Sequence, residues 1–138
     1  MRRAIGLSVA WSLLTLVLSA AESSKLPERA RSPSPLAGSW EMITTSFIAQ
    51  KHLTPTHFIW VHLEPKTKKI IRSMGGTYKQ EGDDYTETIE FTSPEFADHI
   101  GTKAKFRVKI EGDKWIQTSP DVPQAPKEVW TRLSVKLP

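Results

Sequence analysis

Turn signals divide the chain from residue 36 onward into short segments, and their spacing constrains the fold more than any other feature. Pro65 stands in a charged cluster, Gly75 and Gly76 are adjacent, and Glu-Gly-Asp triplets begin at Glu81 and Glu111. Proline, glycine and aspartate favour turns because they suit the backbone angles that turns require. The segments between these signals are rich in β-branched and aromatic residues and show no long helical pattern, so the sequence predicts an all-β domain.

Hairpin-type connections between such segments predict antiparallel neighbours, arranged as a sandwich or a barrel. Alternation along the chain supports this prediction, because Phe106, Val108 and Ile110 would share one face while the intervening lysines and arginine face the other way. A short irregular stretch over residues 94–99 favours a helical turn. The expected strands cover residues 38–48, 58–63, 70–74, 77–80, 85–91, 103–110, 115–119 and 128–135.

The N-terminus has the pattern of a secretory signal peptide. Arg2 and Arg3 precede an apolar run over residues 4–18, and small residues up to Ala21 follow it. The run is shorter than the roughly 20 residues that span a bilayer, so we expect cleavage after Ala21 and no transmembrane segment afterwards. The predicted organisation is a signal peptide over residues 1–21, a flexible polar linker over 22–35 and a β-domain over 36–138, in a secreted or periplasmic protein.

Charge and cysteine content exclude several classes of function. Removing Arg2 and Arg3 lowers the count of Lys plus Arg from 19 to 17 against 15 Asp plus Glu, which leaves a net charge of +2. The remaining charges are interspersed and form no basic stripe, so we predict no nucleic-acid partner. The chain has no cysteine, which excludes disulfides, thiol catalysis and thiolate zinc sites.

Two terminal motifs resemble the lipocalin and wider calycin arrangement. Gly38-Ser39-Trp40 opens the first predicted strand, and Arg132 lies in the last. The resemblance implies that Trp40 plugs one end of a barrel, that Gly38 lets the chain bend there, and that the Arg132 guanidinium covers the indole. The fold that follows is an antiparallel up-and-down β-barrel of about eight strands, lipocalin-like in type.

Several internal segments resemble a family of small secreted bacterial lipocalin-like proteins, over residues 36–134. The segments are "THFIWVHLEPKTKKI", "GGTY", "YTETIEF", "KIEGDKW" and "EVWTRL". The resemblance implies fold and compartment and gives no particular chemistry. Gln117 departs from some relatives, in which we expect histidine at that position. The residues that match motifs of the family are His57, Trp60, Gly75, Gly76, Tyr78, Tyr85, Glu87, Trp115 and Trp130.

The histidines of "THFIWVH" do not predict a metal site. His57 and His62 are separated by an odd number of positions, so a strand directs them to opposite faces and they cannot chelate one ion. Trp60 would share the face of His62, and the sequence leaves open which face points into the barrel. We predict no metal and no cofactor.

Glu87 is the carboxylate most suited to a functional role, because it is in phase with Tyr85 and Ile89 on a predicted strand. A carboxylate facing inward needs a partner or a raised pKa, and Tyr78 is a candidate partner. The alternative is a surface glutamate on a twisted edge strand. If the barrel is hollow, the predicted ligand-binding residues are His57, Trp60, Tyr78, Tyr85, Glu87 and Trp115.

The function that we predict is binding of a small apolar or amphipathic molecule inside the barrel. One alternative is an isomerase or hydrolase in which His57 and Glu87 transfer protons. A second alternative is a protein-interaction module with a filled barrel. The sequence favours binding over catalysis and assigns no catalytic residue, and it does not address the oligomeric state.

Overall fold

The computed structural model describes residues 34–134 of the chain. The predicted signal peptide and residues 22–33 of the predicted linker therefore lie outside the described residues, as do residues 135–138. The last two linker residues contact the domain, since Ser34 donates a hydrogen bond to Gln80 at 2.9 Å and the Pro35 carbonyl accepts one from Arg132 at 2.8 Å. Ser34 and Pro35 thus pack against the β-domain.

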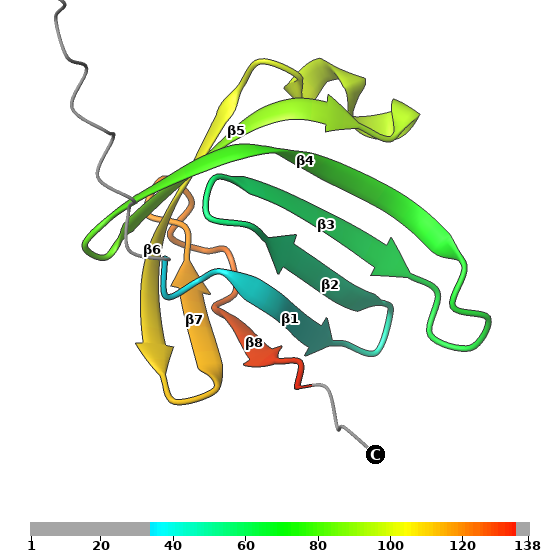
Figure 1. Ribbon diagram of the computed structural model, residues 1–138. Helices are drawn as coiled ribbons and strands as arrows, with labels where there is room; N and C mark the ends of the chain where they lie inside the picture. The colour runs from blue at the N-terminus through cyan, green and yellow to red at the C-terminus, as the bar shows by residue number, and fades with distance from the viewer. Residues whose placement is uncertain (1–33, 135–138) are drawn as a thin grey trace, which may run out of the picture. The chain divides into compact units, whose positions relative to one another are not determined.

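Eight antiparallel strands form a closed barrel in which each strand pairs with the next, and the last strand, β8 (Glu128–Arg132), returns to pair with the first, β1 (Gly38–Ile43) (Figure 1). This arrangement confirms the predicted all-β, lipocalin-like up-and-down barrel. A 3₁₀ helix, η1 (Pro94–His99), follows β5 where the sequence predicted a helical turn. The strands are β1 (Gly38–Ile43), β2 (Ile48–Leu53), β3 (His57–Leu63), β4 (Ile70–Glu81), β5 (Asp84–Thr92), β6 (Lys103–Glu111), β7 (Lys114–Thr118) and β8 (Glu128–Arg132).

A turn interrupts the segment 38–48, which the sequence predicted as one strand. The Thr44 hydroxyl accepts hydrogen bonds from the amides of Ser46 and Phe47 at 3.2 and 3.0 Å, and the Thr44 amide donates to the Phe47 carbonyl at 3.0 Å. A threonine side chain thus supplies the turn contacts, as serine and threonine do in many turns. The single-strand prediction was wrong because this turn contains neither glycine nor proline.

Gly75 and Gly76 lie within β4 and form no turn, so the two strands predicted over 70–74 and 77–80 are one. The register shifts between these glycines, since Gly75 pairs with Phe91 while Gly76 pairs with Ile89. A Cβ atom on Gly75 would lie 2.3 Å from the Phe91 ring, and one on Gly76 would lie 2.0 Å from the carbonyl oxygen of Thr88. The glycines therefore permit a β-bulge and a close approach of two strands. The bulge also ends the alternation of β5, so Ile89 is buried while Phe91 is 48% exposed.

Tryptophan and arginine meet at one end of the barrel. The Arg132 guanidinium carbon lies 4.0 Å from the centre of the Trp40 ring, which is fully buried. Arg132 donates to the carbonyls of Ala37 and Pro35 at 3.0 and 2.8 Å, and the Trp40 indole donates to the Leu36 carbonyl at 2.8 Å. Gly38 has a φ of 129°, and a Cβ there would lie 2.8 Å from the guanidinium. Trp40 and Arg132 thus close this end with both polar groups satisfied.

Large aromatic side chains fill the interior next to this closure. Trp115 contacts Trp40 edge-on at 5.5 Å between ring centres, and Tyr85 contacts Trp115 in the same way at the same distance. Perpendicular pairs of this kind are the favoured geometry for aromatic rings. The barrel is therefore packed solid at the end that Trp40 and Arg132 close.

No helix within residues 34–134 is long and apolar enough to cross a membrane.

Candidate ligand cavity

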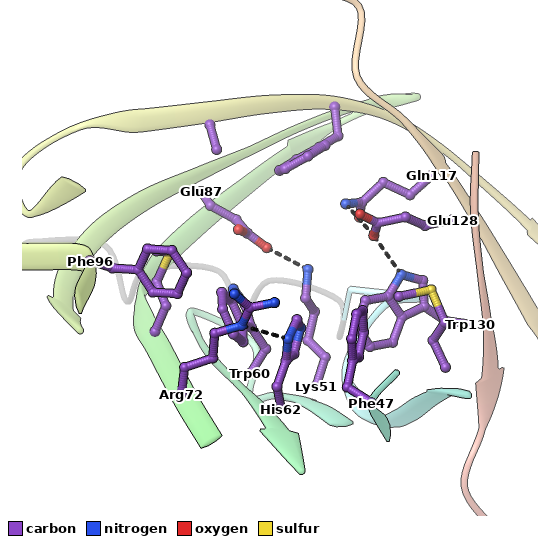
Figure 2. A pocket seen from close by; sticks show the side chains of 14 residues that line it. Phe47, Lys51, Trp60, His62, Arg72, Glu87, Phe96, Gln117, Glu128 and Trp130 are labelled. Carbon is purple, nitrogen blue, oxygen red and sulfur yellow. Dashed lines mark hydrogen bonds and ion pairs between the residues drawn. The ribbon is translucent and has the colours of Figure 1, made fainter. Parts of the chain in front are cut away.

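A cavity of about 330 Å³ lies inside the barrel, beyond the filled end (Figure 2). Its size falls in the range of small-molecule sites. Every one of the eight strands contributes to its lining, as do Phe47 from the turn between β1 and β2 and Phe96 from η1. The lining residues on the strands are Met42, Lys51, Trp60, His62, Arg72, Met74, Glu87, Ala104, Phe106, Gln117, Glu128 and Trp130.

A buried ion pair forms part of the cavity wall. The Lys51 ammonium lies 2.8 Å from a Glu87 carboxylate oxygen, and both residues are only 2% exposed. The Tyr85 hydroxyl donates to the same oxygen at 2.8 Å. Burial raises the pKa of Tyr85 well above its ordinary value, and the charge of Glu87 and the hydrogen bond to it add to this effect. Tyr85 thus remains a neutral donor, and the carboxylate is held by two partners.

Aromatic rings surround the Lys51 ammonium. Removing this charge from water is expensive, and the negative faces of aromatic rings offset part of the cost. Five rings have their centres within 6 Å of the Lys51 nitrogen: Trp115 at 4.9 Å, Trp130 at 5.1 Å, Tyr85 at 5.7 Å, Phe106 at 5.8 Å and Phe58 at 5.9 Å. The cavity wall therefore shows how this barrel accommodates an ammonium group: with one carboxylate and several ring faces.

The second polar group in the cavity wall is the pair formed by His62 of β3 and Arg72 of β4. Arg72 donates from Nε to Nδ1 of His62 at 3.0 Å, and the His62 ring stacks on Phe47 with 4.0 Å between centres and an interplanar angle of 8°. The guanidinium also lies near the rings of Phe96 and Phe47, at 5.5 and 5.9 Å. Burial lowers the pKa of His62 from 6.5 to about 4, and the charges of Arg72 and then Lys51 contribute. His62 is therefore neutral at pH 7 and accepts at Nδ1.

A third polar group lies on β7 and β8, across the cavity from Arg72 (Figure 2). One oxygen of Glu128 accepts hydrogen bonds from the Gln117 amide nitrogen at 3.1 Å and from the Trp130 indole at 3.0 Å. Gln117 is 2% exposed, and its carbonyl oxygen is buried without a hydrogen-bond partner. Within residues 34–134, Glu128 takes part in no ion pair.

Protonation of His62 should destabilise the fold, which gives a testable pH dependence. A folded-state pKa of about 4 below an unfolded-state value of 6.5 means that the unfolded chain binds more protons between these values. We expect the contribution of His62 to the free energy of unfolding to be fully present above about pH 6.5. It should fall by about 1–2 kcal/mol as the pH drops to about 4, which is less than the full shift implies because solvent partly screens the half-buried ring. The physical reason is first that burial disfavours the charged imidazolium, and then that the positive charges of Arg72 and Lys51 repel it.

Urea unfolding from about pH 7 to about pH 4 measures this effect. His62→Gln supplies an acceptor that does not titrate in this range, so its stability should depend less on pH than that of the unaltered protein. His52→Gln removes an exposed histidine and is the matched control. Equal pH dependence in the unaltered protein and His62→Gln would contradict the prediction.

The predicted ligand-binding residues occupy three different environments. Trp60 and Glu87 line the cavity. Tyr85 and Trp115 are fully buried behind its wall, while Tyr78 packs beside Tyr85 at 5.4 Å between ring centres and donates to the Thr54 carbonyl at 2.8 Å. The structure thus brings Trp60 and Glu87 together in one cavity and assigns the three other aromatic residues to packing.

His57 lies outside the barrel and Glu87 inside it, so the structure does not form the His57–Glu87 pair of the alternative enzyme hypothesis. His57 is exposed, and its Nδ1 is 2.7 Å from the hydroxyl of Thr56. The physical reason is strand alternation: Trp60 and His62 point inward, so His57, an odd number of positions away, points outward. Its side chain lines a separate surface hollow of about 380 Å³, together with His52, Ile59 and Phe91 among others.

Sequence reasoning missed Lys51, Arg72 and Glu128 as cavity residues. A signal for Lys51 was present, because Ala49, Lys51 and Leu53 share one face of β2 and a buried Glu87 requires a cation. His62 was placed correctly relative to Trp60, although its orientation was left open. Gln117 was noted only as a departure from some relatives. Arg72 follows Ile70 and Ile71, and Glu128 lies between Lys127 and Val129, so neither position shows an alternation that would assign its side chain to the interior.

Within residues 34–134, no cluster of three or more histidine, aspartate and glutamate side chains could hold a metal ion.

Comparison with known proteins adds no functional assignment to this geometry. No protein-family model matches the chain. No curated protein matches it either.

Proposed function

We propose that the protein binds a small amphipathic molecule inside its barrel. The observation that carries the proposal is the cavity of about 330 Å³, in which aromatic and methionine side chains alternate with three fixed polar groups. Ligand sites typically combine an apolar lining with a few well-placed polar groups. An apolar body would pack against Trp60, Phe106 and Trp130, and its polar atoms would meet Arg72, His62 or Glu128.

The two alternative functions have less support. The enzyme hypothesis depended on proton transfer between His57 and Glu87, and these residues do not share the cavity. Glu87 is instead engaged by Lys51 and Tyr85, which leaves it poorly suited to act as a base. The filled-barrel hypothesis fits only the end of the barrel that Trp40 and Trp115 pack.

The proposal extends to the protein family and to the cellular compartment. The closed barrel and the contact between Arg132 and Trp40 support membership of the small secreted bacterial lipocalin-like proteins. The N-terminal sequence pattern supports export, so the ligand would be met in the periplasm or outside the cell.

Blocking the cavity tests the proposed function. Ala104 lines the cavity, and Ala104→Trp would fill part of it, whereas Lys105→Trp adds the same side chain at an exposed position. We expect Ala104→Trp to weaken binding of the fluorescent probe anilinonaphthalene sulfonate by about tenfold or more, because the added indole occupies the ligand volume. Lys105→Trp should leave the affinity within about twofold of its original value.

Native mass spectrometry of protein expressed in the periplasm provides an independent readout. A co-purified small molecule should be retained by the unaltered protein and Lys105→Trp and lost from Ala104→Trp. Equal probe affinity for the two variants, once circular dichroism shows that both are folded, would mean that the probe binds elsewhere and that the proposal is wrong.

A further inference from the structure

Glu128 presents a carboxylate oxygen to the cavity that has no hydrogen-bond partner and no ion pair within the described residues. Its other oxygen is fixed by the donors of Gln117 and Trp130 at 3.1 and 3.0 Å. Two donors at one oxygen hold the carboxylate in a single orientation, and the residue is only partly buried. The free oxygen is therefore an oriented acceptor on the wall of an otherwise largely apolar cavity.

Gln117 adds a second unsatisfied acceptor at the same place. Its amide nitrogen must face Glu128, because a carboxylate only accepts hydrogen bonds, and this fixes the carbonyl as the other end of the amide. The carbonyl oxygen is buried and has no partner. A buried carbonyl left without a donor costs about 1–3 kcal/mol, so such a group calls for an explanation. Trp115, on the same face of β7, has a buried indole N–H that also lacks a partner, so the Gln117 carbonyl does not by itself call for a ligand, and Glu128 is the group that carries the argument.

The chemistry of these acceptors indicates which group they bind. We infer that this surface of the cavity, defined as Gln117, Glu128 and Trp130, is a subsite for a protonated amine on the ligand. An ammonium group has several N–H donors and a positive charge, so it can donate to the free Glu128 oxygen, balance the Glu128 charge and lie near the Trp130 ring. The inference rests on the proposed function and narrows it to one class of ligand.

Lys51 shows that the barrel already holds an ammonium group in this manner. Its partners are the Glu87 carboxylate and ring faces that include Trp130, at 5.1 Å. Glu87 balances the positive charge of Lys51, so Lys51 does not balance the negative charge of Glu128. Arg72 lies on the opposite side of the cavity and donates to His62, so it does not compete for Glu128 (Figure 2). A ligand amine would supply a positive charge to balance the negative charge of Glu128.

Three probes of similar shape test the amine subsite on the unaltered protein. Phenethylamine carries an ammonium group, phenethyl alcohol a neutral hydroxyl, and hydrocinnamate a carboxylate. We expect phenethylamine to bind about tenfold or more tightly than either of the others in titrations followed by nuclear magnetic resonance, because only the ammonium group both donates to Glu128 and carries the opposite charge. Equal or tighter binding of the alcohol or of hydrocinnamate would overturn the inference.

A variant identifies Glu128 as the group responsible. Glu128→Gln keeps the shape and removes the charge, and we expect it to weaken phenethylamine binding about tenfold or more while leaving phenethyl alcohol within about twofold. Glu111→Gln makes the same change of net charge at an exposed position and should alter neither affinity. Unchanged amine affinity in Glu128→Gln would also overturn the inference. If that variant does not fold, the three-probe comparison on the unaltered protein decides.

Failure of this inference can be distinguished from failure of the proposed function. If anilinonaphthalene sulfonate binds in the cavity and phenethylamine does not, the amine subsite is wrong and cavity binding stands. If neither compound binds, and Ala104→Trp behaves like the unaltered protein, both the subsite and the proposed function are wrong.

Discussion

Replacing Lys51 by methionine should lower the free energy of unfolding by about 3–5 kcal/mol, among the largest effects that one substitution can have in this domain. The reason is that Glu87 would remain 2% exposed with its charge balanced by no cation and with Tyr85 as its only hydrogen-bond donor among the described residues. Methionine keeps most of the volume of the lysine stem, so the loss reports the missing charge rather than a cavity. Urea unfolding followed by tryptophan fluorescence measures it.

Two further variants separate the ion pair from the general effect of losing a lysine. Lys79→Met breaks the exposed pair with Glu81 and should cost at most about 1 kcal/mol. The double variant Lys51→Met with Glu87→Met removes both buried charges and should recover most of the loss, because an apolar pair of similar volume often replaces a buried ion pair at little cost. A loss in Lys51→Met no larger than that in Lys79→Met would show that the Lys51–Glu87 pair is not desolvated.

Gly76→Ala should destabilise the barrel by about 3 kcal/mol or more, or prevent folding. The alanine Cβ would lie 2.0 Å from the Thr88 carbonyl oxygen and 2.9 Å from the Glu90 amide nitrogen. Both are backbone atoms of the paired strand β5, so neither can move aside without separating β4 from β5. The bulge between these strands would have to be rebuilt, and the longest ladder of the barrel would be disrupted.

Gly82→Ala is the matched control for this substitution. Gly82 has a φ of 61°, and a Cβ there would meet nothing within 4 Å. The cost should therefore be the strain of a positive φ alone, about 1–2 kcal/mol. Thermal and urea unfolding of the two variants side by side give the comparison. Similar losses in Gly76→Ala and Gly82→Ala would contradict a steric role for Gly76 in the bulge.

The fold was predictable because alternation and turn signals act locally. Residues 103–110 alternate in burial as their sequence indicates, and the Glu-Gly-Asp triplets do form hairpin turns. Two elements escaped prediction for physical reasons. The turn after β1 depends on the hydroxyl of Thr44, and a pair of adjacent glycines favours a turn or a bulge equally well. Only the neighbouring strand, which presses Phe91 against Gly75, distinguishes the two.

The site was predictable only in part. The sequence singled out Glu87 as a carboxylate that would need a partner if it faced inward, with a surface position as the alternative, and the structure buries it. The odd spacing of the histidines correctly implied opposite faces. The inward face of β3 could not be chosen, because both faces carry large apolar side chains. The partner of Glu87 could not be predicted either, because Lys51 and Glu87 lie 36 positions apart in the sequence and on strands that do not pair with each other.

The seam between β1 and β8 determines when the barrel can close. Only Trp40 and Glu41 of β1 have partners on β8, and the hydrogen bond from Arg132 to Ala37 joins residues 95 positions apart. In a chain made from its N-terminus, β1 can pair with β2 early, yet its other edge stays unpaired until the last strand is complete. An open strand edge is a template for association with other chains. The nascent protein thus keeps the open edge of β1 until Arg132 reaches Trp40, and closure of the seam removes that edge.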